Sequence, residues 1–134
     1  LLFNNFSFAE EKNDEESLHW VVVNLKNHIE KEFHKDINLK QLAALYDFNE
    51  KYLGRIFKSE TGVTFHEYLN EIRLEKATEM LLNTEDSVIS ISKKCGFNNV
   101  TYFNRLFLKK FEKTPLEFKN SKSNRFWDRH SYLL

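Results

Sequence analysis

Two segments of the sequence, fifty residues apart, place cationic and hydrogen-bonding side chains at helical spacing. The segments are YLGRIFKS at 52–59 and YFNRLFLK at 102–109. In both, apolar residues recur at the spacing of a buried helix face and leave an arginine on the opposite face. The exposed stripe of the first segment carries three cations, and its members, at i, i+3, i+4 and i+7, are Lys51, Gly54, Arg55 and Lys58.

The equivalent stripe of the second segment offers a different chemistry. Its members are Thr101, Asn104, Arg105 and Leu108, with Val100 and Lys109 on either side. Arginine can donate two hydrogen bonds to guanine, asparagine can pair with adenine, and threonine and valine can touch the methyl group of thymine. A single exposed arginine is ordinarily only solvated, but two at equivalent positions after equivalent turns indicate recognition of base edges in DNA.

A further set of side chains suits the DNA backbone rather than the bases. Lys58 and Lys109 lie farther along the two expected helices. Asn49 is expected to cap the first of these helices, and either Asn98 or Asn99 the second. Such side chains can contact phosphates, and these contacts position a helix on DNA without reading the base sequence. The expected phosphate contacts are Asn49, Lys58, Asn99 and Lys109.

Helix signals surround the first stripe. An amphipathic pattern runs from Leu18 to about residues 34–35, and a short helix is expected to start at Leu39. Asp47 marks a tight turn, because aspartate tolerates the left-handed backbone conformation. Gly62 is expected to end the helix that carries the first stripe.

Similar signals surround the second stripe. Thr64-x-x-Glu67 is a capping box that opens a helix of about twenty residues. Its length of roughly 30 Å nearly matches the roughly 34 Å of one turn of B-DNA. A second short helix is expected to end at Gly96, and a last one to begin at Thr114-Pro115.

The sequence therefore predicts an all-α fold of about seven helices, with two helix-turn-helix subdomains joined by a long linking helix. The predicted segments are a linker or tail at 1–16, a DNA-binding domain at 17–120 and a C-terminal tail at 121–134. Within the domain we expect the first helix-turn-helix at about 38–62, the linking helix at about 64–83 and the second helix-turn-helix at about 87–113.

The neutral net charge hides an uneven distribution along the chain. Residues 1–16 hold five acids and one Lys, for −4, and residues 17–92 hold twelve acids and nine Lys/Arg, for −3. Residues 93–134 hold ten Lys/Arg and three acids, for +7. The last third is therefore a basic module, as expected of a segment that contacts nucleic acid.

The sequence gives little indication of an enzyme, a metal-binding protein or a membrane protein. The single cysteine, Cys95, lies on an apolar face before a turn, where a structural thiol is expected. The five histidines form no HxxxH or HExxH pattern, so we expect no metal, no cofactor and no enzyme activity. No apolar run reaches the roughly 18–20 residues that span a membrane, and we expect a cytoplasmic protein. The alternative to DNA binding is a helical protein-interaction module.

These features together resemble the AraC/XylS family of bacterial transcription regulators. The matching segments, within about residues 18–120, are LA at 42–43, YLGRIFKSETG at 52–62, YLNEIRLEKATEMLLNT at 68–84, GFNNVTYFNRLF at 96–107 and TPLEFK at 114–119. The resemblance implies two helix-turn-helix subdomains that bind consecutive major grooves of double-stranded DNA. It implies that the residues that read bases are Lys51, Gly54, Arg55, Val100, Thr101, Asn104 and Arg105. It also implies RNA polymerase as a partner, and an upstream sensing or dimerisation domain that we expect to be missing from this chain.

The chain departs from the family pattern at several positions. Asp47 and Glu112 replace glycines, and Leu108 replaces a lysine. Gly54 has no side chain to offer a base. Because the basic charge is concentrated in the last third, we hypothesise that the second subdomain anchors the protein on DNA and the first tunes binding.

Overall fold

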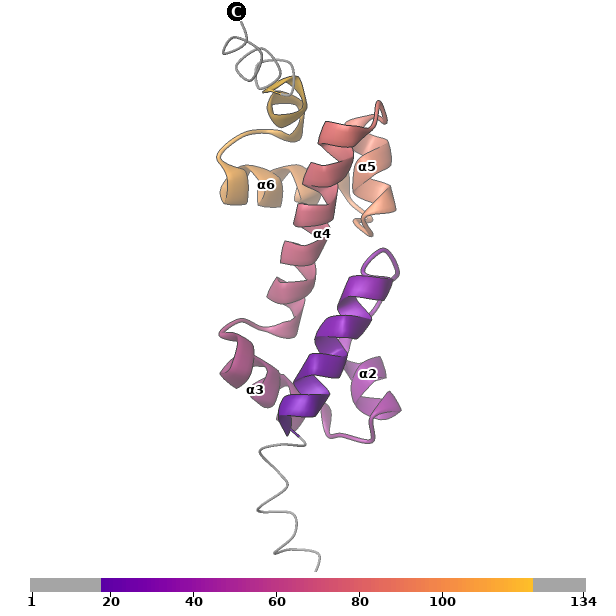
Figure 1. Ribbon diagram of the computed structural model, residues 1–134, viewed down its shortest axis with the longest axis vertical. Helices are drawn as coiled ribbons and strands as arrows, with labels where there is room; N and C mark the ends of the chain where they lie inside the picture. Colours follow the sequence, from indigo (N-terminus) through magenta and orange to yellow (C-terminus); the bar gives the residue numbers. More distant parts are fainter. Residues whose placement is uncertain (1–17, 122–134) are drawn as a thin grey trace, which may run out of the picture. The chain divides into compact units, whose positions relative to one another are not determined.

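The computed structural model describes residues 18–121, and all regular secondary structure within them is helical. The helices cover residues 18–32, α2 (Leu39–Leu45), α3 (Glu50–Thr61), α4 (Phe65–Asn83), α5 (Val88–Lys94), α6 (Val100–Phe111) and residues 115–121 (Figure 1). The all-α prediction is confirmed, whereas the predicted linker at 1–16 and nearly all of the predicted tail lie outside the described residues. None of the described helices is long and apolar enough to cross a membrane.

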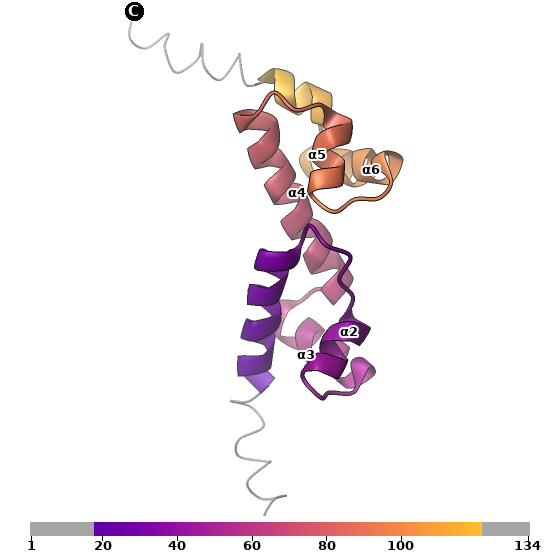
Figure 2. The ribbon, with the colours of Figure 1, turned by 90° about the vertical axis from the view of Figure 1, so that its right-hand side faces the viewer.

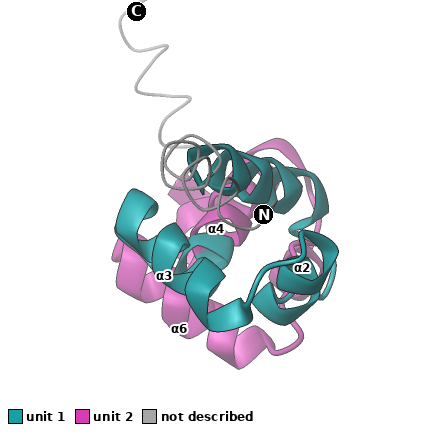
Figure 3. Ribbon diagram, turned by 90° about the horizontal axis from the view of Figure 1, so that it is seen from below, with its two compact units in different colours: residues 1–70 teal, residues 71–134 magenta. Residues whose placement is uncertain are grey.

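The chain divides into two compact units, residues 1–70 and 71–134, and the division falls within α4 (Figure 3). Each unit contains a short helix, a turn and a twelve-residue helix. In the first unit α2 lies against α3, and in the second α5 lies against α6 (Figures 1 and 2). The two predicted helix-turn-helix subdomains are therefore confirmed.

Side-chain caps begin the helices at the predicted residues. Asn38 caps α2 and Ser87 caps α5, and each side-chain oxygen accepts from the backbone N–H three residues later, at 2.8 and 3.1 Å. At the start of α4 the Thr64 hydroxyl accepts from the N–H of Glu67 at 3.1 Å. The Glu67 carboxylate accepts in return from the N–H of Thr64 at 3.0 Å. These bonds satisfy N–H groups that have no partner within the helix.

Within residues 18–121, each unit holds two residues in the left-handed region, one in the turn and one after the long helix. In the first unit these are Asp47, with φ 60°, and Gly62, with φ 83°. In the second they are Gly96, with φ 97°, and Glu112, with φ 59°. The prediction that Asp47 tolerates this conformation is confirmed. Glu112 adopts the same conformation although its side chain disfavours it.

The core of the first unit centres on Phe57 of α3, which is fully buried. Its ring meets the rings of Phe65 and Tyr68 edge-on, with centroids 5.8 and 5.4 Å away. These contacts attach α3 to the first turn of α4. Leu25 and Ile29 of the first helix are also fully buried.

The core of the second unit contains a row of aromatic rings. Phe103 and Phe107 of α6 are fully buried, and their ring centroids are 5.7 Å apart. Phe97 meets Phe103 at 5.0 Å, and Phe118 of the last helix meets Phe107 at 5.5 Å. Packing of this face leaves the opposite face of α6 directed to solvent.

The structure differs from the sequence prediction in two details. The first helix ends at residue 32 rather than near residues 34–35. α4 buries Asn70, Arg73 and Leu74 in addition to the apolar residues whose helical spacing predicts its inner face, which are Phe65, Leu69, Ile72, Ala77 and Leu81. The cause is that α4 supplies side chains to both units, so a single apolar stripe does not describe it. The Arg73 guanidinium lies over the ring of Phe97, 5.8 Å from its centroid.

Candidate nucleic-acid interface

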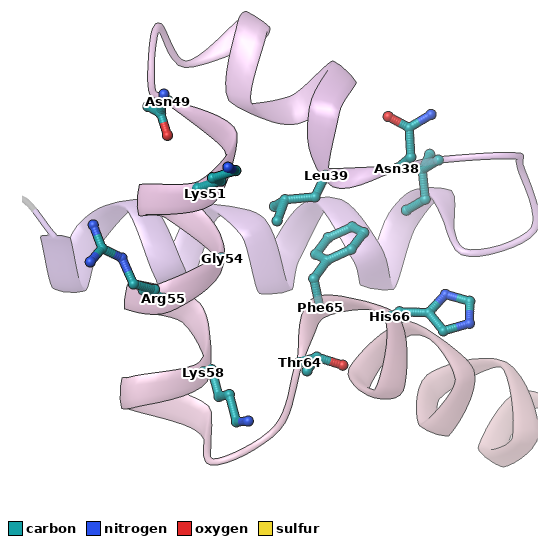
Figure 4. Close-up of a pocket in the computed structure, with 11 residues that line it drawn as sticks. Asn38, Leu39, Asn49, Lys51, Gly54, Arg55, Lys58, Thr64, Phe65 and His66 are labelled. Carbon is teal, nitrogen blue, oxygen red and sulfur yellow. The ribbon is translucent and has the colours of Figure 1, made fainter.

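The outward face of α3 carries the first predicted stripe. Lys51, Arg55 and Lys58 are exposed, and Gly54 lies half-buried among them (Figure 4). The stripe is outward because the opposite face of the helix is buried, through Leu53, Ile56 and Phe57. The structure therefore brings these four predicted residues onto one accessible surface of the first unit.

The outward face of α6 carries the second stripe. Thr101, Asn104 and Arg105 are exposed, and Leu108 retains 48% of its accessible surface. Val100 differs from these residues, because it is half-buried and packs against the core of the second unit. The side chain of Val100 therefore contributes to the packing of the second unit, although the residue lies at the start of the helix predicted to read bases.

Each predicted reading arginine lies over a tyrosine one helical turn earlier. The Arg55 guanidinium is 5.8 Å from the ring centroid of Tyr52, and that of Arg105 is 5.5 Å from the ring centroid of Tyr102. An arginine held over an aromatic ring is stabilised by the electrons of the ring. The guanidinium is thereby held in a similar position in both units.

The tyrosines are themselves held by phenylalanines in the turns. Phe48 stacks on Tyr52 with centroids 6.4 Å apart, and Phe97 lies at the same distance from Tyr102. This role of the tyrosines is not among the predictions from the sequence. The signal was available, because a Tyr three residues before an Arg occurs in both segments and such pairs are neighbours on a helix.

The predicted capping asparagines begin both reading helices. Asn49 Oδ1 accepts from the N–H of Tyr52 at 3.1 Å, and Asn99 Oδ1 accepts from the N–H of Tyr102 at 3.0 Å. The cap at α6 is thus Asn99 rather than Asn98. Because the cap uses the amide oxygen, the amide nitrogen is the group that can donate to a phosphate.

α3 and α6, the two helices predicted to read bases, differ in charge. α3 contains three cations and two glutamates, for +1, whereas α6 contains three cations and no acid, for +3. One of the α6 cations, Lys110, approaches the carboxylate of Glu75 at 4.0 Å. Lys58 and Lys109, the predicted phosphate contacts, are both exposed in the last turns of their helices.

Gly54 has a packing role that the sequence did not reveal. A Cβ placed on Gly54 would lie 3.2 Å from Cδ2 of Leu39, at the start of α2. That distance is shorter than an ordinary van der Waals contact, so a larger residue requires Leu39 to move. The glycine therefore permits close approach of α2 and α3, which is a sufficient reason for its presence besides any contact with DNA.

Cys95 is a buried thiol, as the sequence predicts. It has no exposed surface, and burial raises its pKa to about 11. At neutral pH the thiolate that nucleophilic chemistry requires is therefore scarce. Cys95 Sγ lies 3.8 Å from the sulfur of Met80. Within residues 18–121 no three His, Cys, Asp or Glu side chains are arranged to hold a metal ion.

Comparison with known proteins places this geometry among transcription regulators. A family model described as "Helix-turn-helix domain" matches residues 42–121. The transcriptional activator RhaS of Klebsiella pneumoniae (strain 342) is 31% identical over 123 residues, which are 91% of this chain and 43% of the relative. The chain thus spans less than half the length of that relative.

Solved structures agree with the fold. The C-terminal domain of AraT, a response regulator from Geobacillus stearothermophilus, superposes with a TM-score of 0.72 and 31% identity, over 75% of this chain and 84% of that one. The DNA-binding domain of AdpA, solved in complex with a target DNA, has a TM-score of 0.69. The aligned region covers 81% of this chain and 94% of the AdpA chain. Because the identity is 23%, the similarity concerns the fold alone.

Proposed function

Because this chain belongs to the AraC/XylS family of DNA-binding transcription regulators, we propose that α3 and α6 enter successive major grooves of one DNA site. The observation that carries this proposal is the repeated arrangement of a reading arginine over a tyrosine on the exposed face of each helix. One short helix that reads a few base pairs discriminates weakly. Two helices that read adjacent blocks combine their selectivity.

The proposed base contacts are hydrogen bonds, contacts with thymine methyl groups, and contacts from the two other residues of the α3 stripe. Arg55 and Arg105 would each donate two hydrogen bonds to a guanine, and Asn104 would pair with adenine. Thr101 and Val100 would touch a thymine methyl group. Lys51 and Gly54 lie on the same stripe of α3, where Lys51 adds a donor and Gly54 lets the backbone approach the base pairs.

Phosphate contacts would position both helices. We assign them to Asn49 and Lys58 in the first unit, and to Asn99 and Lys109 in the second. Each phosphate neutralised by a cation releases counterions, so the logarithm of the affinity should fall steeply with the logarithm of the salt concentration. A protein-interaction module held by apolar contacts would show a much weaker dependence on salt.

The full-length protein would act in the cytoplasm, where it would change transcription by contacting RNA polymerase. The relative RhaS is a transcriptional activator, and this chain covers 43% of its length. We therefore also propose that an additional domain for sensing or dimerisation precedes the DNA-binding domain. In that arrangement the two units described here supply the choice of DNA site.

Binding selection from a randomised duplex pool tests the proposal. The expected result is an enriched site with two short blocks about one helical turn, or about 10 base pairs, apart. Repeating the selection with Arg105→Ala should relax one block and leave the other intact. Salt-sensitive binding to every duplex, without enrichment of any sequence, would contradict the proposal.

A further inference from the structure

The first unit contains an open hollow beside its reading helix. Its volume is about 920 Å³, and its walls come from the start of α2, the outward face of α3 and the start of α4 (Figure 4). Pockets that bind small molecules typically measure about 300–1,000 Å³. The hollow therefore has the size of a ligand site.

The floor of the hollow is apolar. Phe65 is 6% exposed, and Ile37 and Leu39 are half-buried beside it. Leu39 lies against α3 at Gly54, where an added Cβ would be 3.2 Å from its Cδ2 (Figure 4). Because Gly54 has no side chain, it leaves this apolar surface open where a larger residue would cover it.

The rim of the hollow is cationic. Lys51, Arg55 and Lys58 of α3 line it, and none of its eleven lining residues is acidic. Apolar pockets with a small number of convergent polar groups bind ligands in a fixed orientation. An occupant that matches both the floor and the rim has an apolar body and one negative charge.

The corresponding region of the second unit has a different chemistry. Asp86 stands two residues before α5, as Ile37 stands two residues before α2. Its carboxylate accepts from Lys94 Nζ at 2.7 Å, and its backbone carbonyl accepts from Lys119 Nζ at 2.7 Å. Asn104 occupies the position of Gly54, and Leu108 that of Lys58. The second unit thus has an acid at the position of Ile37, a side chain at the position of Gly54 and an apolar residue at the position of Lys58, which removes the features that would accept an amphipathic anion.

We propose that the hollow of the first unit is a binding site for an amphipathic organic anion. The apolar body of the ligand lies on Ile37, Leu39 and Phe65, and its carboxylate or sulfonate meets one cation of the rim, the ammonium group of Lys51 or that of Lys58. The next step rests on the proposed function: since the same cations would face DNA, the ligand competes with DNA for the first unit. Effector control would then act within the DNA-binding domain itself.

Nuclear magnetic resonance titration of this chain with 2-naphthoate tests the site without DNA. The expected result is a saturable shift of the backbone amides of Leu39, Gly54 and Phe65, with little change on α6. Neutral 2-naphthamide should bind about tenfold more weakly, because it lacks the charge that the lysines attract. Shifts spread equally over α3 and α6, or equal binding of the amide, would overturn the proposal.

A pair of matched variants tests the floor. Ile37→Asn removes apolar surface inside the hollow and should weaken naphthoate binding about fivefold. Val23→Asn makes the same change in polarity at an exposed apolar residue of the first helix, outside the hollow, and should leave binding unchanged. The dispersion of the spectra verifies that both variants are folded. Equal binding by both folded variants would contradict the assignment.

Competition with DNA is measured separately by fluorescence anisotropy of a labelled duplex. Naphthoate should lower the DNA affinity of the wild type and have a much smaller effect on Ile37→Asn. Saturable binding at the hollow without any effect on DNA affinity would overturn the competition. Failure of the chain to bind DNA at all would contradict the proposed function, while the titration would still decide whether the hollow is a site.

Discussion

The two units have the same order of helices and the same two backbone positions in the left-handed region. Each unit has a glycine at one of these positions, and it is a different position in each unit. In the first unit the turn holds Asp47 and the end of the long helix holds Gly62; in the second the turn holds Gly96 and the helix end holds Glu112. All four residues have φ between 59° and 97°. At each of the two positions, an acidic residue in one unit therefore adopts the left-handed conformation that a glycine adopts in the other.

The outward faces of α3 and α6 have the same supporting contacts in both units but differ in their exposed side chains. Both helices hold an arginine over a tyrosine at nearly the same distance. Beside that arginine, α3 presents Lys51 and Gly54 where α6 presents Thr101 and Asn104. We infer that the exposed stripe of the first unit offers mainly cations, whereas that of the second adds groups for directional hydrogen bonds to a helix of higher net charge. This agrees with the hypothesis that the second unit anchors and the first tunes.

The largest expected effect concerns the cores, which should be equally important in both units. Phe57→Ala and Phe107→Ala each remove a fully buried ring and should lower the free energy of unfolding by about 3–5 kcal/mol. Chemical denaturation measures the loss. A change below 1 kcal/mol for one variant only would show that the two cores are not equivalent.

The next effect concerns base reading in the second unit. Asn104→Gly gives α6 the residue that α3 has at this position, and removes the group proposed to pair with adenine. Discrimination at one base pair should fall by about 1–3 kcal/mol, or roughly 5- to 150-fold. Competition between matched and mismatched duplexes measures it. Unchanged discrimination would show that Asn104 does not read a base.

A smaller effect is expected at the tyrosines that support the arginines. Tyr52→Ala and Tyr102→Ala should each weaken DNA binding by about 0.5–1 kcal/mol, because the guanidinium loses the ring that holds it. Tyr52→Phe and Tyr102→Phe keep the ring and serve as matched controls that should bind nearly as well as the wild type. Binding by the Phe variants as weak as that of the Ala variants would assign the effect to the hydroxyl group instead.

The smallest effect concerns the left-handed residues. Glu112→Gly relieves a conformation that costs about 1–2 kcal/mol for an ordinary residue, offset by about 0.5–1 kcal/mol for the entropy of glycine. A net gain in stability of about 0–1.5 kcal/mol is expected. Asp47→Gly should gain less, because aspartate tolerates this region better. Thermal unfolding measures both, and a loss of stability for Glu112→Gly would contradict the account.

Local features of the fold were largely predictable from the sequence. The caps at Asn49 and Ser87, the capping box at the start of α4 and the left-handed conformation of Asp47 depend on residues within a few positions of each other. Such contacts leave a signature in residue type and spacing. The predicted outward stripes are likewise exposed, because the apolar period of each helix determines its buried face.

Features that depend on packing between helices were not predictable in this way. The contact of Gly54 with Leu39 joins residues fifteen positions apart on two helices, and no local pattern announces it. Burial of Asn70 and Arg73 follows from the position of α4, which contributes to both units. The hollow of the first unit is also formed by three separate elements, so its residues share no periodic spacing.

The most direct test of the account compares Arg55→Ala with Arg105→Ala on one selected DNA site, at fixed salt concentration. The account predicts a roughly 10- to 100-fold loss of affinity for Arg105→Ala, because this variant removes a bidentate contact to guanine. The loss for Arg55→Ala should be several-fold smaller. Arg55→Lys and Arg105→Lys keep the charge and remove the fork, so both should bind more weakly than the wild type, and the second should be impaired more strongly than the first. Equal losses for the two alanine variants, or a larger loss for Arg55→Ala, would contradict the division between an anchoring and a tuning unit.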